Sequence, residues 1–323
     1  MSEKWKLPPE GGMLDAPGEV YLQNMTMKQV LEKVKRNDIV ILPTGSTESH
    51  GGACPLWVDT LIVTRMAEQL AKRTGVTVAM PTPIGSHPYH HLGMPGTIVL
   101  PEEVFKAQIR AYLAGLWNMG LRKIIIFNTH GQEYVIPSAI HEFMKNYQVP
   151  AVIVHVSWYH IVPDLLKDKE HGGPFETPFI HADEVETSVS LNLFPELVHM
   201  ELAEDNQPRG YLPEGHVDKA GNAYNRPIKW YSQAGLGPIE VSAYPQGSVG
   251  APTKASADNA KPAVVAIMDY MEKLIEDIKE RFPPGVLPPV EEITQRDPAL
   301  LEPYLKFPLS PGWKSIYELR YPP

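Results

Sequence analysis

Two segments of the chain combine histidine with acidic side chains at spacings that suit a metal ion. In the first, Glu48 and His50 follow an apolar stretch, and Asp59 comes nine residues after His50. Side chains two positions apart in an extended segment lie on the same side, so Glu48 and His50 could approach one centre. Asp59 could return to that centre from the start of the next helix, or it could simply cap that helix. This segment alone leaves both a metal site and a polar loop open.

The second segment runs from Asn128 to Glu133 and contains His130. It directly follows the apolar run Lys123 to Phe127, which is typical of a buried strand. Ligands of open α/β sheets bind beyond the carboxyl ends of the strands. A single histidine there is more often a hydrogen-bonded structural residue, but two such clusters at strand ends of one sheet favour a shared metal site.

A third segment, His181 to Ser188, places a histidine and several acidic residues where a helix is expected to begin. Asp183 and Glu184 suit the first turn of that helix, where carboxylates interact favourably with the helix dipole. We therefore keep His181 and Glu186 as the candidates for chemistry in this segment.

The loop from Gly85 to Thr97 contains three histidines within five positions, His87, His90 and His91. This density resembles a metal-binding tract, but adjacent side chains diverge in any regular backbone. We favour a substrate-facing loop whose glycines and prolines fix its shape. Four residues in this loop and near strand ends are expected to contact the substrate: His91, Thr97, Gln132 and Trp158.

Composition narrows the classes of protein and ligand. With 43% hydrophobic and 21% charged residues the chain is of ordinary globular composition, and its single cysteine, Cys54, cannot form an internal disulfide or a thiolate pair. A metal must then be held by histidine and carboxylate, which suit Zn, Mn, Fe or Mg. The formal net charge of -9 argues against nucleic acid as a partner. Without a secretory signal or a membrane-spanning stretch, a cytoplasmic location and no membrane partner are expected.

Helices and strands alternate along the first half of the chain. Helices are predicted at 27–36, 60–73, 102–119 and 136–147, and strands at 38–42, 76–80, 123–127 and 149–158. This alternation is typical of a three-layer α/β/α fold with a mainly parallel sheet. Apolar residues from Val264 to Ile278 predict one more long helix, with Pro262 in its first turn.

The remaining sequence is less regular. We expect a single α/β domain over residues 1–281, interrupted by an irregular insertion at about 196–247 with possible short strands at 228–232 and 239–243. Residues 282–323 are rich in proline and are expected to form an extension outside this domain.

These segments, in this order, resemble the creatinine amidohydrolase family. Its first motif, E-x-H-G-x-H-L-P-x-x-x-D, is matched at full spacing by five residues: Glu48, His50, Gly51, Pro55 and Asp59. The motif N-G-H-G-x-N resembles 128–133, H-x-x-F-P-G-T resembles 91–97, H-A-G-x-x-E-T-S resembles 181–188, and G-x-x-G-x-P is matched by Gly247, Gly250 and Pro252. The resemblance covers about residues 30–280 and implies a creatininase-like fold and a homo-oligomer, often a hexamer.

The resemblance also implies roles for individual residues. The family's metal ligands correspond here to Glu48, His50, Asp59 and His130. Asp59 would bridge where two ions are bound, so one or two divalent ions (Zn, Mn or Fe) are expected. Glu186 corresponds to a further ligand or the general base, and His181 to a histidine that protonates the departing group.

Several positions depart from the creatinine-hydrolysing members. Gly131 and Gln132 stand where those members carry Tyr and Glu, Thr177 replaces a tryptophan, and Ala53 replaces the second histidine of the first motif. The aromatic clamp for creatinine and part of the site for a second metal are therefore missing.

Together these features predict a metal-dependent hydrolase in which activated water attacks a carbonyl carbon of a small cyclic polar substrate. A cyclic amide is our first interpretation, and hydrolytic C–C cleavage of a cyclic 1,3-diketone is the alternative, because family members perform both reactions. A non-catalytic metal- or sugar-binding protein is a third interpretation, which the retention of His181 and Glu186 disfavours.

Overall fold

The computed structural model of the protein describes residues 4–11, 13–86, 93–207, 243–289, 292 and 297–302. A parallel sheet lies at its centre, with strand order β2-β1-β3-β4. Its strands are β1 (Ile39–Thr44), β2 (Thr77–Val78), β3 (Lys123–Asn128) and β4 (Val152–Ser157). The sheet therefore has the predicted parallel arrangement. The four strands predicted in the first half of the chain all form, although β2 is shorter than its apolar run suggested.

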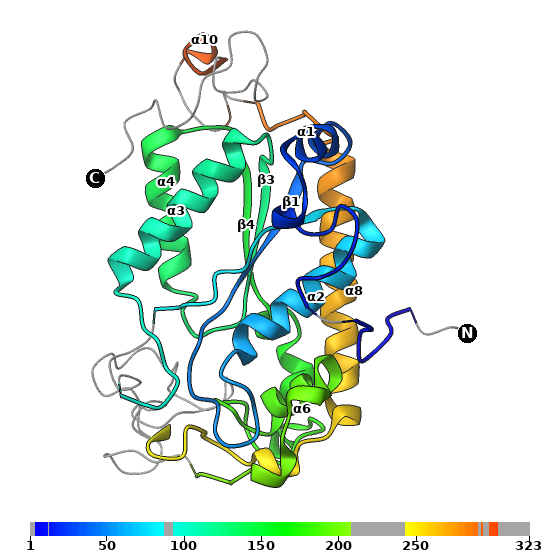
Figure 1. The fold of residues 1–323 in the computed structure, drawn as a ribbon, viewed down its shortest axis with the longest axis vertical. Helices are drawn as coiled ribbons and strands as arrows, with labels where there is room; N and C mark the ends of the chain where they lie inside the picture. The colour runs from blue at the N-terminus through cyan, green and yellow to red at the C-terminus, as the bar shows by residue number, and fades with distance from the viewer. Residues whose placement is uncertain are drawn as a thin grey trace.

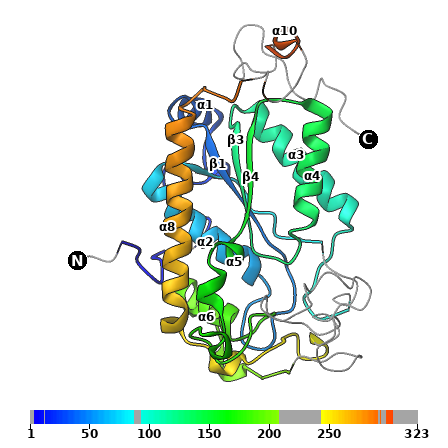
Figure 2. The same cartoon turned by 180° about the vertical axis from the view of Figure 1, so that it is seen from behind.

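Helices cover both faces of the sheet (Figures 1 and 2). The α-helices are α1 (Met27–Arg36), α2 (Val58–Thr74), α3 (Glu102–Asn118), α4 (Val135–Tyr147), α5 (Trp158–Ile161), α6 (Glu184–Leu193), α8 (Ala257–Arg281) and α10 (Pro298–Leu301). The 3-10 helices are η1 (Leu22–Asn24), η3 (Pro163–Leu166), η4 (Lys169–His171), η5 (Pro195–Leu197), η6 (Met200–Leu202) and η8 (Pro252–Lys254). None of the helices in the described part of the chain could cross a membrane, judged by length and apolar character.

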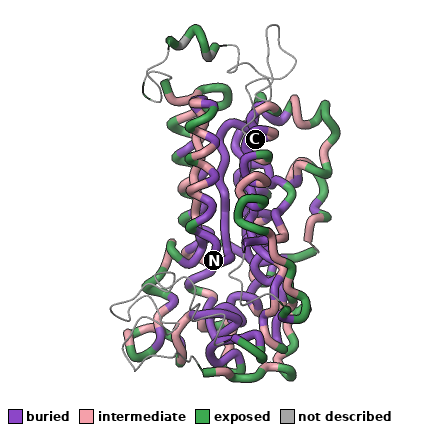
Figure 3. Tube along the Cα trace, turned by 90° about the vertical axis from the view of Figure 1, so that its left-hand side faces the viewer, coloured by how far each residue is buried: buried purple, intermediate pink, exposed green. Residues whose placement is uncertain are grey.

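Alternate strand residues supply two hydrophobic cores. Ile39, Ile41, Ile125 and Phe127 pack with residues of α2, α6 and α8. The residues between them, which include Val40, Leu42, Ile124 and Ile126, pack with α3 and α4 on the other face. Side chains alternate along a strand, so a strand buried on both faces needs an unbroken apolar run. Figure 3 shows the central strands buried along their length, and the predicted three-layer α/β/α fold is confirmed.

The position of Pro262 in its helix differs from the prediction. Helix α8 begins at Ala257, so Pro262 lies in the second helical turn rather than the first. In the second turn the missing N–H of proline removes one backbone hydrogen bond. Between β4 and α6 the chain also forms η3 and η4. Both short strands predicted in the insertion lie outside the described residues, apart from Ala243, as does the extension beyond residue 302.

A buried ion pair joins the sheet to the chain that follows α8. Lys123, fully buried at the start of β3, donates to Asp38 Oδ1 (2.6 Å) and to Pro283 O (2.8 Å). The other oxygen of Asp38 accepts from Gly285 N at 3.1 Å. These contacts lie at the amino ends of the strands, far along the sheet from the segments with candidate site residues.

Candidate metal centre

The carboxyl ends of β1 and β3 bring the first two candidate segments together. Thr44 and Asn128 are partners in the parallel register, so the chain leaves both strands at the same level. Glu48 follows β1, His130 follows β3, and Asp59 lies in the first turn of α2, which packs back against β1. All three side chains are buried.

The side chains meet at distances that suit ligands of one ion. His130 Nδ1 lies 3.0 Å from Glu48 Oε1 and 3.2 Å from Asp59 Oδ2. His50 Nε2 lies 3.5 Å from Glu186 Oε2 and 3.9 Å from Asp59 Oδ1. Ligand atoms about 2.0–2.2 Å from an ion lie roughly 3.0–3.5 Å from one another, so a small cation would fit among these atoms after little movement.

The candidate ligands form three overlapping groups. Atoms within 4.8 Å of one another come from Glu48, Asp59 and His130, from His50, Asp59 and Glu186, and from Glu48, His50 and His181. Glu48, His50 and Asp59 each belong to two of these groups. Asp59 approaches His130 with Oδ2 and His50 with Oδ1, which suits a ligand that bridges two ions. The convergence expected of Glu48, His50, Asp59 and His130 is therefore present, and Glu186 joins it.

Electrostatics also favour a cation at this place. Burial and then the charges of Asp59, Asp183 and Glu48 raise the pKa of Glu186 well above its usual value. Burial alone would lower the pKa of His130, but the carboxylates of Glu48 and Asp59 outweigh it and raise that pKa well above the ordinary value. A divalent cation would compensate this concentration of negative charge, and imidazole and carboxylate are suitable ligands for it.

Neighbouring groups hold the candidate ligands in position. Ser46 Oγ donates a hydrogen bond to Asp59 Oδ2, and Thr97 Oγ1 accepts one from Ser49 N at 3.0 Å, between Glu48 and His50. Ser46 was not among the predicted site residues, although a hydroxyl two residues after the end of a buried strand was the available signal. Thr97 was predicted to contact substrate, and in the structure it also orders the segment that carries Glu48.

The third segment reaches the centre from the turn before α6. His181 precedes the helix, its Nε2 donates to Ser49 O at 3.0 Å, and its ring centroid is 4.8 Å from that of His50. Ala182 has a left-handed backbone (φ 46°), and its N–H donates to Glu186 Oε2 at 2.7 Å. This turn therefore brings both His181 and Glu186 to the cluster.

Asp183 and Glu184 have the structural roles that the helix start indicated. Asp183 is the N-cap of α6 and accepts from Glu186 N at 3.0 Å. Glu184 Oε2 accepts from the backbone N–H groups of Glu176 and Thr177, both at 2.8 Å. Neither carboxylate belongs to a candidate ligand group among the described residues.

Two glycines of the late motif allow close packing around these segments. A Cβ at Gly250 would lie 2.6 Å from Asp183 Cβ, and a Cβ at Gly247 would overlap Ser49 Oγ. Both glycines have positive φ angles, which other residues rarely adopt. The two glycines therefore let this part of the chain pack closely against Ser49, next to His50, and against Asp183, close to His181.

The predicted substrate contacts are placed unevenly. Gln132 is fully buried, and its amide bonds to Gly45 O (3.1 Å), Ser86 N (3.0 Å) and Asn128 Oδ1 (3.3 Å), so it ties loops together. Trp158 is fully buried against Tyr159 and Phe179. His91 lies outside the described residues, as do His87 and His90. Direct substrate contact by Thr97, Gln132, Trp158 and His91 stays a prediction.

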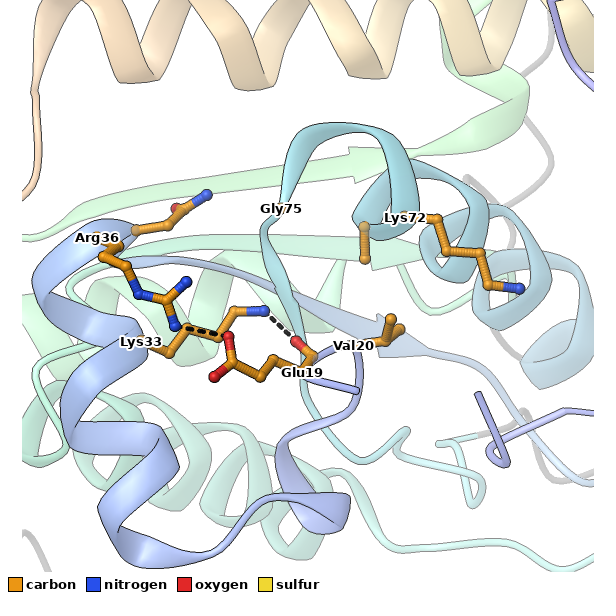
Figure 4. A pocket seen from close by; sticks show the side chains of 8 residues that line it. Glu19, Val20, Lys33, Arg36, Lys72 and Gly75 are labelled. Atoms are coloured by element: carbon orange, nitrogen blue, oxygen red, sulfur yellow. Dashed lines mark hydrogen bonds and ion pairs between the residues drawn. The ribbon is translucent and has the colours of Figure 1, made fainter. Parts of the chain in front are cut away.

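A pocket of about 360 Å³ lies elsewhere, beside the carboxyl-terminal ends of α1 and α2 (Figure 4). Its cationic side chains already have partners. Arg36 pairs with Glu19 at 2.7 Å, Lys33 Nζ donates to Glu19 O, and Lys72 pairs with Glu68 at 2.5 Å. None of the candidate ligands lines this pocket, so it is distinct from the candidate metal centre.

Comparisons with known proteins agree with this geometry. The sequence model of a family described as "Creatininase: Creatinine amidohydrolase" matches residues 23–275. The 3-dehydro-scyllo-inosose hydrolase of Thermotoga maritima is 57% identical over 304 residues, which are 94% of this chain and 98% of that protein. A solved structure, "Creatininase Mn", is similar with a TM-score of 0.63 and 20% identity over 83% of this chain and all of its own. A mutant creatininase of Zn-Zn type has a TM-score of 0.64 with the same identity and coverage.

Proposed function

The chain belongs to the creatinine amidohydrolase family of metal-dependent hydrolases, and on that premise we propose that it opens a polyhydroxylated cyclic 1,3-diketone by hydrolysis of a C–C bond. The observation that carries this proposal is the 57% identity, over nearly the whole chain, to a 3-dehydro-scyllo-inosose hydrolase. The cyclic amide, our first interpretation from the sequence, becomes the alternative. Three departures from the creatinine-hydrolysing members support ranking the diketone before the cyclic amide: Gly131, Gln132 and Thr177.

The proposed substrate has two ring ketones separated by one carbon. Water adds to one ketone carbon, and the bond from that carbon to the intervening carbon breaks. The electron pair enters an enolate conjugated with the second ketone, and a proton returns to the intervening carbon. One molecule of water is consumed, and the product is a linear keto acid with all the ring carbons. The second ketone is essential because it makes the carbon leaving group stable.

Five residues would hold one or two divalent ions: Glu48, His50, Asp59, His130 and Glu186. A bound ion would polarise the attacked carbonyl and make the attacking water more acidic. The manganese and zinc forms among the similar structures support zinc or manganese as the metal, with iron also compatible with these ligands.

Two side chains of the third segment are suited to move protons. Glu186 Oε2 accepts a hydrogen bond from Ala182 N at the edge of the cluster, and a carboxylate held there is suited to accept a proton from the attacking water. His181, fixed by Ser49 O, would return the proton to the departing carbon. Glu186 either accepts the proton from water or completes the ligand set. If Glu186 is the base, Glu186→Gln should reduce turnover more than metal content. If Glu186 is a ligand, the variant should reduce metal content at least as much as turnover.

The test is to incubate the metal-loaded enzyme with 3-dehydro-scyllo-inosose and, separately, with creatinine and other cyclic amides, and to follow products by ¹³C NMR. We expect a new carboxylate carbon and loss of one ketone carbon from the diketone, with no such reaction in His50→Ala. Turnover of a cyclic amide together with an inert diketone would overturn the proposal. Homo-oligomerisation is a further part of the proposal, which light scattering after size-exclusion chromatography tests.

A further inference from the structure

A buried carboxylate beside the metal centre has an unused oxygen. Glu133 comes three residues after His130 in the same loop and is only 8% exposed. Its Oε2 accepts a hydrogen bond from the Tyr159 hydroxyl at 3.0 Å, whereas its buried Oε1 has no hydrogen-bond partner among the described residues. A buried carboxylate oxygen without a donor is costly, so this atom points to a ligand that donates a hydrogen bond.

Tyr159 keeps this carboxylate in place without neutralising it. The phenol ring packs edge-on against Trp158, at 5.6 Å between centroids, and lies 5.8 Å from Phe179. Burial and then the charge of Glu133 raise the pKa of Tyr159 well above its usual value, and the Asp59 carboxylate adds to this effect. The hydroxyl is therefore a neutral donor, and the pair lies near Asp59 of the metal cluster.

Other polar atoms of the same two segments also have unused hydrogen-bonding capacity. Trp158 Nε1, a donor, and Thr129 Oγ1, which both donates and accepts, are buried without hydrogen-bond partners among the described residues. A hydroxyl group donates and accepts at once, so a ring that carries several hydroxyls matches this mixture of donors and acceptors. A ketone or a simple hydrocarbon ring could not donate to Glu133.

We propose that Glu133, held by Tyr159, binds hydroxyl groups of the substrate ring beside the metal centre and thereby selects polyhydroxylated rings. This inference rests on the proposed function, since it names how that substrate class is recognised. The family motif N-G-H-G-x-N has asparagine where this chain has Glu133, so the carboxylate is a departure from the family pattern. An asparagine can accept a hydrogen bond too, but a carboxylate binds a hydroxyl donor more strongly.

The test compares Glu133→Gln with wild type on two diketones, 3-dehydro-scyllo-inosose and cyclohexane-1,3-dione, which lacks hydroxyls. A hydrogen bond to a charged group is stronger than a neutral one by about 1–1.5 kcal/mol, so kcat/KM for the hydroxylated ring should fall by about 5- to 10-fold, mainly through KM. For cyclohexane-1,3-dione the change should stay within about 2-fold. Glu102→Gln is the matched control, because Glu102 also accepts from a tyrosine (Tyr134, 3.5 Å) but is exposed.

A second measurement does not depend on turnover of the hydroxyl-free ring. The inhibition constant of scyllo-inosose, a hydroxylated ring with one ketone, should rise in Glu133→Gln by about the same factor as KM, again from loss of a charged hydrogen bond. An unchanged inhibition constant, equal losses on both diketones, or loss of bound metal would each overturn the inference. If wild type itself leaves 3-dehydro-scyllo-inosose intact while scyllo-inosose still distinguishes the variants, the proposed function fails and the hydroxyl subsite stands.

Discussion

Replacing Gln132 by alanine should destabilise the protein and disturb the metal centre together. The Gln132 amide joins three parts of the chain at the carboxyl edge of the sheet, through Gly45 O (3.1 Å), Ser86 N (3.0 Å) and Asn128 Oδ1 (3.3 Å). Gln132→Ala leaves Gly45 O and Ser86 N buried without these partners. Each such group costs about 1–3 kcal/mol, so we expect the free energy of unfolding to fall by about 3–5 kcal/mol.

The disturbance should reach His130, because Gly85 packs against both the Gln132 and the His130 side chains. A Cβ placed at Gly85 would lie 2.8 Å from Gln132 Oε1 and 3.1 Å from His130 Cδ2, so little free space separates these groups. Removing the amide leaves a void into which the segment of Gly85 and Ser86 can move. We therefore expect kcat/KM to fall as well, with some loss of bound metal.

Thermal unfolding of the metal-loaded protein measures the stability loss. An unfolding entropy of about 2.1 cal/mol/K per residue converts the expected change into a Tm that is lower by about 4–7 °C. Gln108→Ala on α3 is the control, because Gln108 Oε1 has no hydrogen-bond partner among the described residues and its loss should shift Tm by no more than about 1 °C. An unchanged Tm with a raised KM would refute this reasoning and favour direct substrate contact by Gln132, as its place after a strand first suggested.

The contacts of the described residues support three further predictions. Asp59→Asn should reduce bound metal both at the group of Glu48 and His130 and at the group of His50 and Glu186, whereas His130→Ala should reduce it only at the first. Inductively coupled plasma mass spectrometry measures the bound metal, and equal losses in the two variants would contradict a bridging role for Asp59. Lys123→Met should lower the free energy of unfolding by about 3–5 kcal/mol in urea, because it leaves the Asp38 carboxylate buried, and adding Asp38→Leu should recover much of the loss. If the double variant is no more stable than the single one, the buried charge is not the cause. Burial raises the pKa of Cys54 to about 12, so this thiol should react with Ellman's reagent at pH 8 only after unfolding, and rapid labelling of the native protein would be inconsistent with the structure.

The fold could be predicted where burial leaves a simple pattern. The apolar run Lys123 to Phe127 indicated a strand covered on both faces, and β3 is such a strand with alternate residues in two cores. Because parallel strands place their carboxyl ends at one edge, the sequence also predicted that Glu48 and His130 would meet there. The start of α8 was misplaced because the helix contains no large apolar residue between its first residue, Ala257, and Val264.

The contacts that hold the site could not be read from local patterns. The hydrogen bond from Gln132 to Gly45 spans 87 residues, and that from His181 to Ser49 spans 132 residues. Polar residues in loops can meet many partners, and only the packed fold decides among them. Tyr159 gave no signal of its partnership with Glu133, because its aromatic ring fits equally well in an ordinary hydrophobic core.

The central claim is that Glu48, His50, Asp59, His130 and Glu186 hold a divalent ion on which ring opening depends. The most direct measurement follows bound metal and turnover of 3-dehydro-scyllo-inosose in the same samples during chelation and stepwise return of zinc or manganese. We expect both quantities to fall together and to recover together, and neither to recover in Asp59→Asn. Full turnover by metal-free enzyme would contradict the claim.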